Sequence, residues 1–85
     1  MAEDIRNNIP KEILLRGIIS KNIKNFRKAR NITQEDLSRL TGISRITIAR
    51  WETCQQSTSV EHLLIIANAL NVSINDLLNG WEEVF

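Results

Sequence analysis

The chain has 85 residues, which is enough for one domain with a modest hydrophobic core. Its hydrophobic content of 42% and charged content of 25% are ordinary for a soluble globular protein. A single Cys54 and a single His62 exclude an internal disulfide and a metal cluster built from these residue types, and no apolar run approaches the roughly 18 residues of a membrane span. We therefore expect a cytoplasmic protein with no metal, no cofactor and no membrane partner.

The near-neutral net charge of +1 hides a strong separation of charge along the chain. Residues 16–50 hold nine basic and two acidic side chains, a net of +7, whereas residues 51–85 hold five acidic side chains and no Lys or Arg, a net of −5. Asymmetry of this kind points to a polyanionic partner, although a solvated basic helix face is the plainer alternative.

The N-terminal part, 1–17, reads as an arm or an extra helix. Pro10 suits the first position of a helix, and apolar residues recur at helical spacing after it. Either one bent helix runs from Pro10 to Arg30, or a short helix precedes a main helix over 18–30. Gly17 weakens a helix by about 1 kcal/mol relative to Ala, so we expect a break or bend there. The apolar group at Ile13, Leu14 and Leu15 serves either packing within the chain or contact with a second copy.

Two short helices, 33–41 and 44–53, form the centre of the chain. Thr33 and Ser44 are good N-cap residues, and Gly42 gives the backbone freedom for a tight turn between the helices. The apolar spacing predicts a shared buried seam made of Leu37, Leu40, Ile43, Ile48 and Trp51. The second helix then exposes two arginines, Arg45 and Arg50, which favours a DNA-reading element.

Two further helices follow a polar loop over 53–58. Ser59 and Ser73 are predicted to cap helices over 59–70 and 73–79, and 80–85 is a short aromatic tail. The first of these helices is expected to bury Val60, Leu63, Ile66, Ala67 and Leu70. No stretch alternates with the period of two that a strand requires, so the fold class is all-α.

Three runs together resemble the helix-turn-helix domain of Cro and phage repressors, the lambda repressor-like or XRE family. They are KNIKNFRKARNITQEDL at 21–37, GISRITIARWE at 42–52 and LLIIANALNVSINDLL at 63–78. The resemblance covers 18–79 and implies a compact five-helix DNA-binding domain, here with an added N-terminal helical extension. It also implies binding to operator DNA, usually as a two-fold homodimer.

The resemblance assigns roles to particular positions. Arg27 and Glu52 match a pair that forms an ion pair between helices, and Gln34 matches a phosphate-binding glutamine. Ser44 matches a residue that caps the recognition helix and can touch DNA. The candidate DNA-binding residues are Gln34, Ser44, Arg45, Ile46, Thr47, Ala49, Arg50, Gln55 and Gln56.

Two departures from the family pattern concern the exit from the second helix. The family usually has Gly where Cys54 stands, so we expect this helix end to have a different shape. The loop after it lacks the usual basic residues, so Gln55 and Gln56 are expected to hold DNA phosphates by hydrogen bonds rather than by charge.

The sequence thus predicts a sequence-specific DNA-binding transcriptional regulator, a repressor, that inserts helix 44–53 into the major groove. Arginine forks match the N7 and O6 acceptors of guanine, and apolar side chains contact a thymine methyl. The alternative is an antitoxin-type module that binds a partner protein through its apolar arms. An enzyme is not expected, because His62 has no clustered nucleophile and no Gly-rich phosphate loop is present.

Overall fold

The computed structural model describes residues 8–85, and every element within them is helical. The elements are α2 (Lys11–Ala29), α3 (Gln34–Thr41), α4 (Arg45–Glu52), α5 (Val60–Leu70), α6 (Ile74–Leu78) and a short 3-10 helix, η1 (Trp81–Val84). The expected all-α class and the order of the five main helices are confirmed. The portion of the N-terminal arm before Asn8 lies outside the described residues.

Polar caps define where the short helices begin, as the sequence predicts. The hydroxyls of Thr33, Ser44, Ser59 and Ser73 each accept a backbone N–H from the first turn that follows. At α3 and α6 the cap is reciprocal, because Asp36 and Asp76 accept the backbone N–H of the capping residue in return. These side chains satisfy amide protons that have no partner inside the helix.

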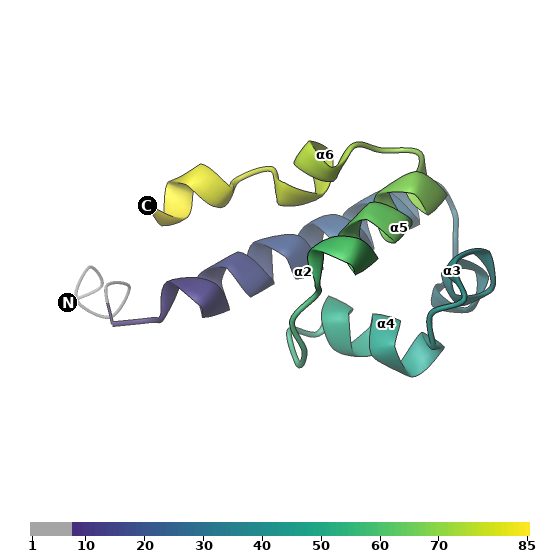
Figure 1. Cartoon of the computed structure of the whole chain (residues 1–85), viewed down its shortest axis with the longest axis horizontal. Coiled ribbons are helices and arrows are strands. Elements are labelled where there is room, and N and C mark those ends of the chain that lie inside the picture. Colours follow the sequence, from purple (N-terminus) through teal and green to yellow (C-terminus); the bar gives the residue numbers. More distant parts are fainter. Residues whose placement is uncertain (1–7) are drawn as a thin grey trace.

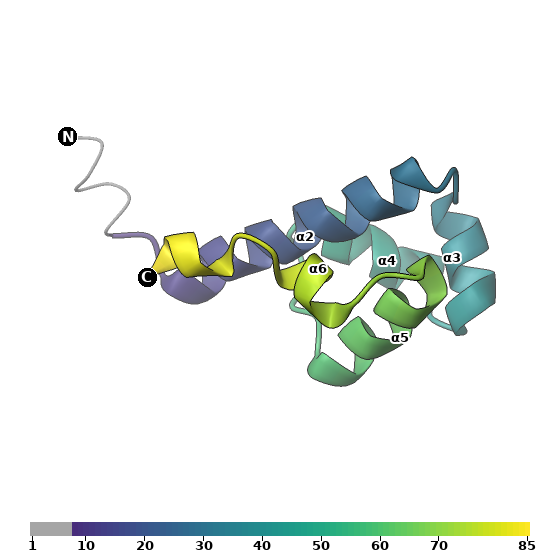
Figure 2. The same cartoon turned by 90° about the horizontal axis from the view of Figure 1, so that it is seen from above.

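The longest helix, α2, runs without interruption through Gly17. The expectation of a break at this glycine, with a separate main helix beginning at residue 18, is therefore wrong, and a single helix spans both parts. The α6–η1 segment lies along α2 in both views (Figures 1 and 2), and the Ile18 side chain lies 3.9 Å from where a Cβ on Gly80 would stand. Packing of this segment on α2 offsets the cost of one glycine inside a helix, which is about 1 kcal/mol relative to alanine.

The core lies where α2, α3, α4, α5 and α6 meet. Nine buried apolar side chains form it: Ile23, Leu37, Ile48, Trp51, Leu63, Ile66, Ala67, Leu70 and Leu77. Two expectations about the core are wrong, because Leu40 remains 62% exposed and Val60 63% exposed. Both residues lie on the solvent-facing sides of their helices. The spacing of apolar residues alone places them on the buried sides.

The C-terminal segment is fastened to α2 rather than extended into solvent. Asn22 donates hydrogen bonds to the carbonyl oxygens of Leu77 (2.8 Å) and Asn79 (3.0 Å). Farther along, the Lys11 ammonium lies 4.6 Å from the centre of the Phe85 ring, and η1 lies beside the first turns of α2 (Figure 2). Trp81 and Phe85 still remain 46% and 68% exposed.

Length and hydropathy together decide whether a helix can span a membrane. No single helix between Asn8 and Phe85 is long and apolar enough to cross a membrane, although the bent pair Val60–Leu70 and Ile74–Val84 meets that test when its members are counted together.

Candidate nucleic-acid interface

The helix α4 is held against the body of the protein by its inner face. Ile48 and Trp51 are buried, and the centroid of the Trp51 ring lies 5.1 Å from the centroid of the His62 ring on α5. His62 is also bonded to its own helix cap, with Nδ1 2.9 Å from the Ser59 hydroxyl. This anchoring fixes the orientation of α4, so that its opposite face points to solvent.

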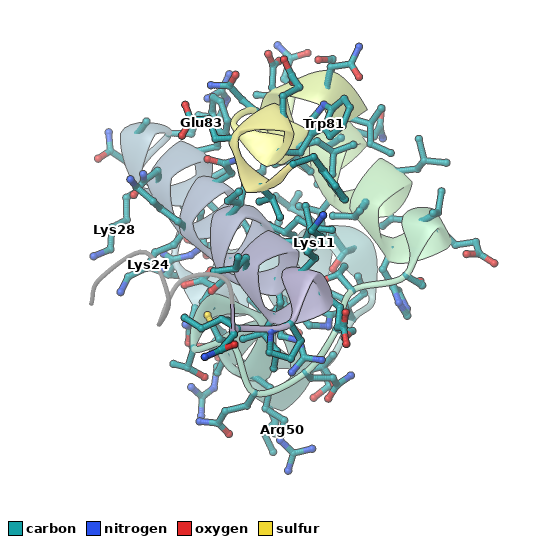
Figure 3. All side chains as sticks on the ribbon, turned by 90° about the vertical axis from the view of Figure 1, so that its left-hand side faces the viewer. Lys11, Lys24, Lys28, Arg50, Trp81 and Glu83 are labelled. Atoms are coloured by element: carbon teal, nitrogen blue, oxygen red, sulfur yellow. The ribbon has the colours of Figure 1, made fainter. Side chains whose placement is uncertain are left out.

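The outer face of α4 brings together most of the sequence-predicted site. Arg45, Ile46 and Arg50 are exposed, and Ala49 is half-buried between them. A shallow surface hollow of about 280 Å³ is lined by Arg45, Ile46, Ala49, Arg50, Thr53 and Gln55. Figure 3 shows Arg50 pointing away from the body, on the side opposite Trp81 and Glu83 of η1.

The other predicted residues of this region lie around that hollow. Ser44 caps α4 by accepting the N–H groups of Ile46 (3.1 Å) and Thr47 (3.4 Å). Thr47 and Gln56 are half-buried and do not line the hollow. Sequence reasoning missed Thr53, because its position at the end of α4 gave no sign that it would share the hollow; its hydroxyl donates to the carbonyl of Ala49 at 2.8 Å.

A buried ion pair ties α4 to α2. Arg27 donates from Nε to Glu52 Oε2 at 2.7 Å and from Nη2 to Glu52 Oε1 at 2.8 Å, and its Nη1 donates to the carbonyl of Ile32 at 2.8 Å. The hydrogen bond with Glu52 raises the pKa of Arg27 above its ordinary value, against the opposing effect of burial. The pair expected from the family resemblance is confirmed, and it occupies the Arg27 guanidinium.

Gln34 lies apart from the hollow and joins the ion pair instead. Its Nε2 donates to Glu52 Oε1 at 3.1 Å, and the residue is half-buried at the first position of α3. An amide nitrogen carries two protons, so one donor and the carbonyl oxygen of Gln34 remain for another partner. Sequence spacing alone does not indicate this contact, because the two residues lie eighteen positions apart.

The exit from α4 is a regular left-handed turn despite its unusual residue. Cys54 has φ +62°. Its N–H donates to the carbonyl oxygen of Trp51 (3.3 Å), and the N–H of Gln55 donates to the carbonyl oxygen of Arg50 (2.8 Å). This pattern is the Schellman ending that glycine usually makes. The expectation of a differently shaped helix end is therefore wrong, and Cys54 is exposed within the usual geometry.

Charge is distributed unevenly around this surface. Lys24 and Lys28 extend from one side of α2, Arg50 extends from the outer face of α4, and Glu83 lies on the side of the molecule opposite Arg50 (Figure 3). Between Asn8 and Phe85, no group of three or more His, Cys, Asp or Glu residues is placed to hold a metal ion.

Comparisons with known proteins agree with this arrangement. Residues 23–77 match the family model HTH_3, described as helix-turn-helix. The chain is 41% identical over 61 residues to the antitoxin PezA of Streptococcus pneumoniae, covering 72% of this chain and 39% of that protein. It is 31% identical over 64 residues to the control protein C.SmaI of Serratia marcescens, covering 75% and 76% of the two chains.

Among solved structures, an HTH_3 family transcriptional regulator from Vibrio cholerae superposes with a TM-score of 0.78 at 25% sequence identity. That alignment covers 85% of this chain and 41% of the other. The chain therefore spans about two fifths of the length of both PezA and this regulator.

Proposed function

The chain belongs to the helix-turn-helix family HTH_3, and on that premise we propose that it is a sequence-specific DNA-binding transcriptional regulator that acts as a repressor. The observation that carries the proposal is the outer face of α4, where Arg45 and Arg50 are exposed and both line one shallow hollow. B-DNA's major groove is wide enough to admit one α-helix.

The residues of this face suit the reading of base edges. The planar forks of Arg45 and Arg50 match the N7 and O6 acceptors of guanine, while Ile46 and Ala49 offer apolar contact to a thymine methyl. Ser44 and Thr47 lie at the start of α4, close to the same bases. Gln34, Gln55 and Gln56 carry amides suited to phosphate oxygens, which fix the position of a protein on the duplex.

The test is selection of bound sequences from a random DNA pool, followed by fluorescence anisotropy on the recovered site. Loss of one bidentate guanine contact costs about 1–3 kcal/mol, so Arg45→Ala and Arg50→Ala are each expected to weaken binding to that site roughly 5- to 150-fold. Arg39→Ala, which removes an exposed arginine outside the hollow, is the matched control. Site preference that survives the double substitution would contradict the proposed role of α4.

Two copies are proposed to act together. A single α4 reaches only a few base pairs, whereas a two-fold dimer places two such helices about 34 Å apart on one face of the duplex. An apolar surface between α3 and α5 supports this pairing, because Leu40, Leu64 and Ile65 are exposed there. Together with Thr41, Asn68 and Ala69, these three residues line one shallow hollow. No lining residue is charged, so identical surfaces meet there without like-charge repulsion.

Sedimentation equilibrium tests this dimer in the absence of DNA. Leu64→Glu places a charge at the centre of the apolar surface and is expected to raise the dimer dissociation constant at least tenfold, at an exposed position that folding tolerates. Ile46→Glu makes the same change at a similarly exposed apolar residue outside the surface. Equal self-association of the two variants would exclude this dimer surface.

A second candidate function is that of an antitoxin-type module, which binds a partner protein. Its support is the similarity to PezA together with the exposed apolar side chains of Ile13, Trp81 and Phe85 where α2 and η1 lie side by side. Purification of the tagged protein from its native source tests this role. A small protein that co-purifies in equal amount with the wild type, and is lost with Trp81→Ser, would favour the antitoxin function.

A further inference from the structure

A second hollow lies between the N-terminal half of α2 and the loop that follows α4. Its volume is about 170 Å³, and it is lined by Glu12, Leu15, Arg16, Ile19, Ser57 and Thr58. A protein cavity of about 150 Å³ holds a benzene molecule, so this hollow has room for a phosphate group. Leu15 and Ile19 contribute apolar side chains to its lining, and its polar residues come from α2 and from the loop.

The polar groups of this hollow are mainly donors. The Nε atom of Arg16 is buried and has no hydrogen-bond partner among residues 8–85. Ser57 and Thr58 add two hydroxyl groups at the same place. A guanidinium beside hydroxyl donors is a combination that binds phosphate and carboxylate oxygens. Glu12 is the one acidic lining residue, and it opposes an anion there.

One loop connects this hollow with the proposed DNA-reading face of α4. The loop over 53–59 begins on that face, where Thr53 and Gln55 line the same surface as Arg45 and Arg50. Two or three residues later, a distance of at most about 7–11 Å along extended chain, Ser57 and Thr58 line the second hollow. The loop itself contains no Lys or Arg, and Arg16 is the one basic residue among those that line the second hollow.

We propose that Arg16, Ser57 and Thr58 form an anion site that takes a phosphate of the DNA backbone beside the bases read by α4. In this arrangement, α2 supplies the charge that the loop lacks, and the loop supplies hydroxyl donors. The inference rests on the proposed DNA-binding function. It extends the interface beyond the helix-turn-helix unit to the first half of α2, which the HTH_3 match at residues 23–77 does not include.

Anisotropy with the full chain tests the site. A contact to a phosphate carries no sequence information, so Arg16→Gln is expected to weaken binding about tenfold on target and random DNA alike. The slope of log affinity against log salt concentration is expected to fall by about 0.9. Glu12→Gln is expected to strengthen binding, because it removes the one opposing charge. Circular dichroism establishes that each variant is folded.

Lys11→Gln is the matched control, because it removes one positive charge from the same helix outside the hollow. If Arg16→Gln and Lys11→Gln change affinity and salt slope equally, the site is excluded while DNA binding through α4 stands. If the wild type selects no DNA sequence and binds none, the proposed function itself fails.

Inorganic phosphate distinguishes DNA backbone from a free anion as the ligand. Chemical shifts of the Ser57 and Thr58 amides are followed as phosphate is added without DNA. Weak binding, at tens of millimolar, together with the DNA effects of Arg16→Gln supports the backbone site. Tight binding of free phosphate, with DNA affinity unchanged in Arg16→Gln, would overturn it.

Discussion

The side-chain amide of Gln34 and the carboxylate of Glu52 are joined by a hydrogen bond of 3.1 Å, made to the same oxygen that accepts from Arg27 Nη2. The bond holds the first residue of α3 against the last residue of α4, while Arg27 holds α4 against α2. Three helices therefore meet at one carboxylate. The glutamine proposed to bind phosphate is thus oriented by the same group that fixes the recognition helix.

We expect a graded loss of stability at this junction. Gln34→Ala removes one hydrogen bond to a charged group at a half-buried position and should lower the free energy of unfolding by about 1 kcal/mol. Glu52→Ala leaves the Arg27 charge buried without a partner and should lower it by about 3–5 kcal/mol. Urea unfolding measures both, with Gln55→Ala as the exposed glutamine control. A loss for Gln34→Ala no larger than the control would mean that the bond contributes nothing in solution.

Gly17 is expected to be replaceable with a gain in stability. A Cβ at this position would meet no atom within 4 Å other than those of its chain neighbours and of its own helix backbone, and the residue lies inside continuous helix. Gly17→Ala should therefore raise the free energy of unfolding by about 1 kcal/mol, whereas Gly17→Pro should lower it by about 3 kcal/mol or more. Thermal unfolding followed by circular dichroism is the measurement. An unchanged midpoint in Gly17→Ala would indicate that α2 is interrupted in solution.

Local chemistry explains what the sequence alone predicted well. Thr33, Ser44, Ser59 and Ser73 mark helix starts, because each hydroxyl satisfies an amide in its own first turn. Contacts between distant elements explain what it missed. The outward orientation of Leu40 depends on how α3 packs on α5, and the bond from Gln34 to Glu52 depends on how α3 meets α4.

The same distinction applies to the candidate site. The face of α4 followed from the spacing of two arginines along one short helix. The hollow containing Arg16 did not, because it is formed by residues about forty positions apart in the sequence. The break expected at Gly17 does not form, because a helix-propensity cost of about 1 kcal/mol is easily offset by packing.

Cys54 is expected to be a position of avoidable strain. A side chain in the left-handed region costs about 1–2 kcal/mol, and glycine loses about 0.5–1 kcal/mol through its greater freedom in the unfolded chain. Cys54→Gly should therefore raise the free energy of unfolding by about 0.5–1 kcal/mol. Cys54→Ala retains the Cβ and should show no such gain in urea unfolding. Equal stability of the two variants would argue against a positive φ at this residue.

Asp36 should make part of the stability depend on pH. The hydrogen bond from the Thr33 backbone N–H, with smaller contributions from the Thr33 side chain and Arg39, lowers the pKa of this carboxyl below its ordinary 3.8. The folded state therefore favours the ionised form, and its contribution is present above pH 3.8 and lost as the pH falls through the lowered pKa. The wild type should be more stable than Asp36→Asn at pH 7, and the difference should shrink in acid. A difference that stays constant down to pH 2 would contradict this assignment.

The hydrogen bonds from Asn22 to Leu77 and Asn79 have a consequence for the order of events during synthesis. They join residues 55 and 57 positions apart, so α2 is synthesised well before its partner segment exists. Until then, the α2 surface that later carries α6 and η1 stays uncovered, and contacts of such long sequence separation form late because a large loop must close first. A nascent chain that has not reached Leu77 therefore lacks both partners of the Asn22 side chain, so the docking of the C-terminal segment on α2 completes the fold only after synthesis has passed that residue.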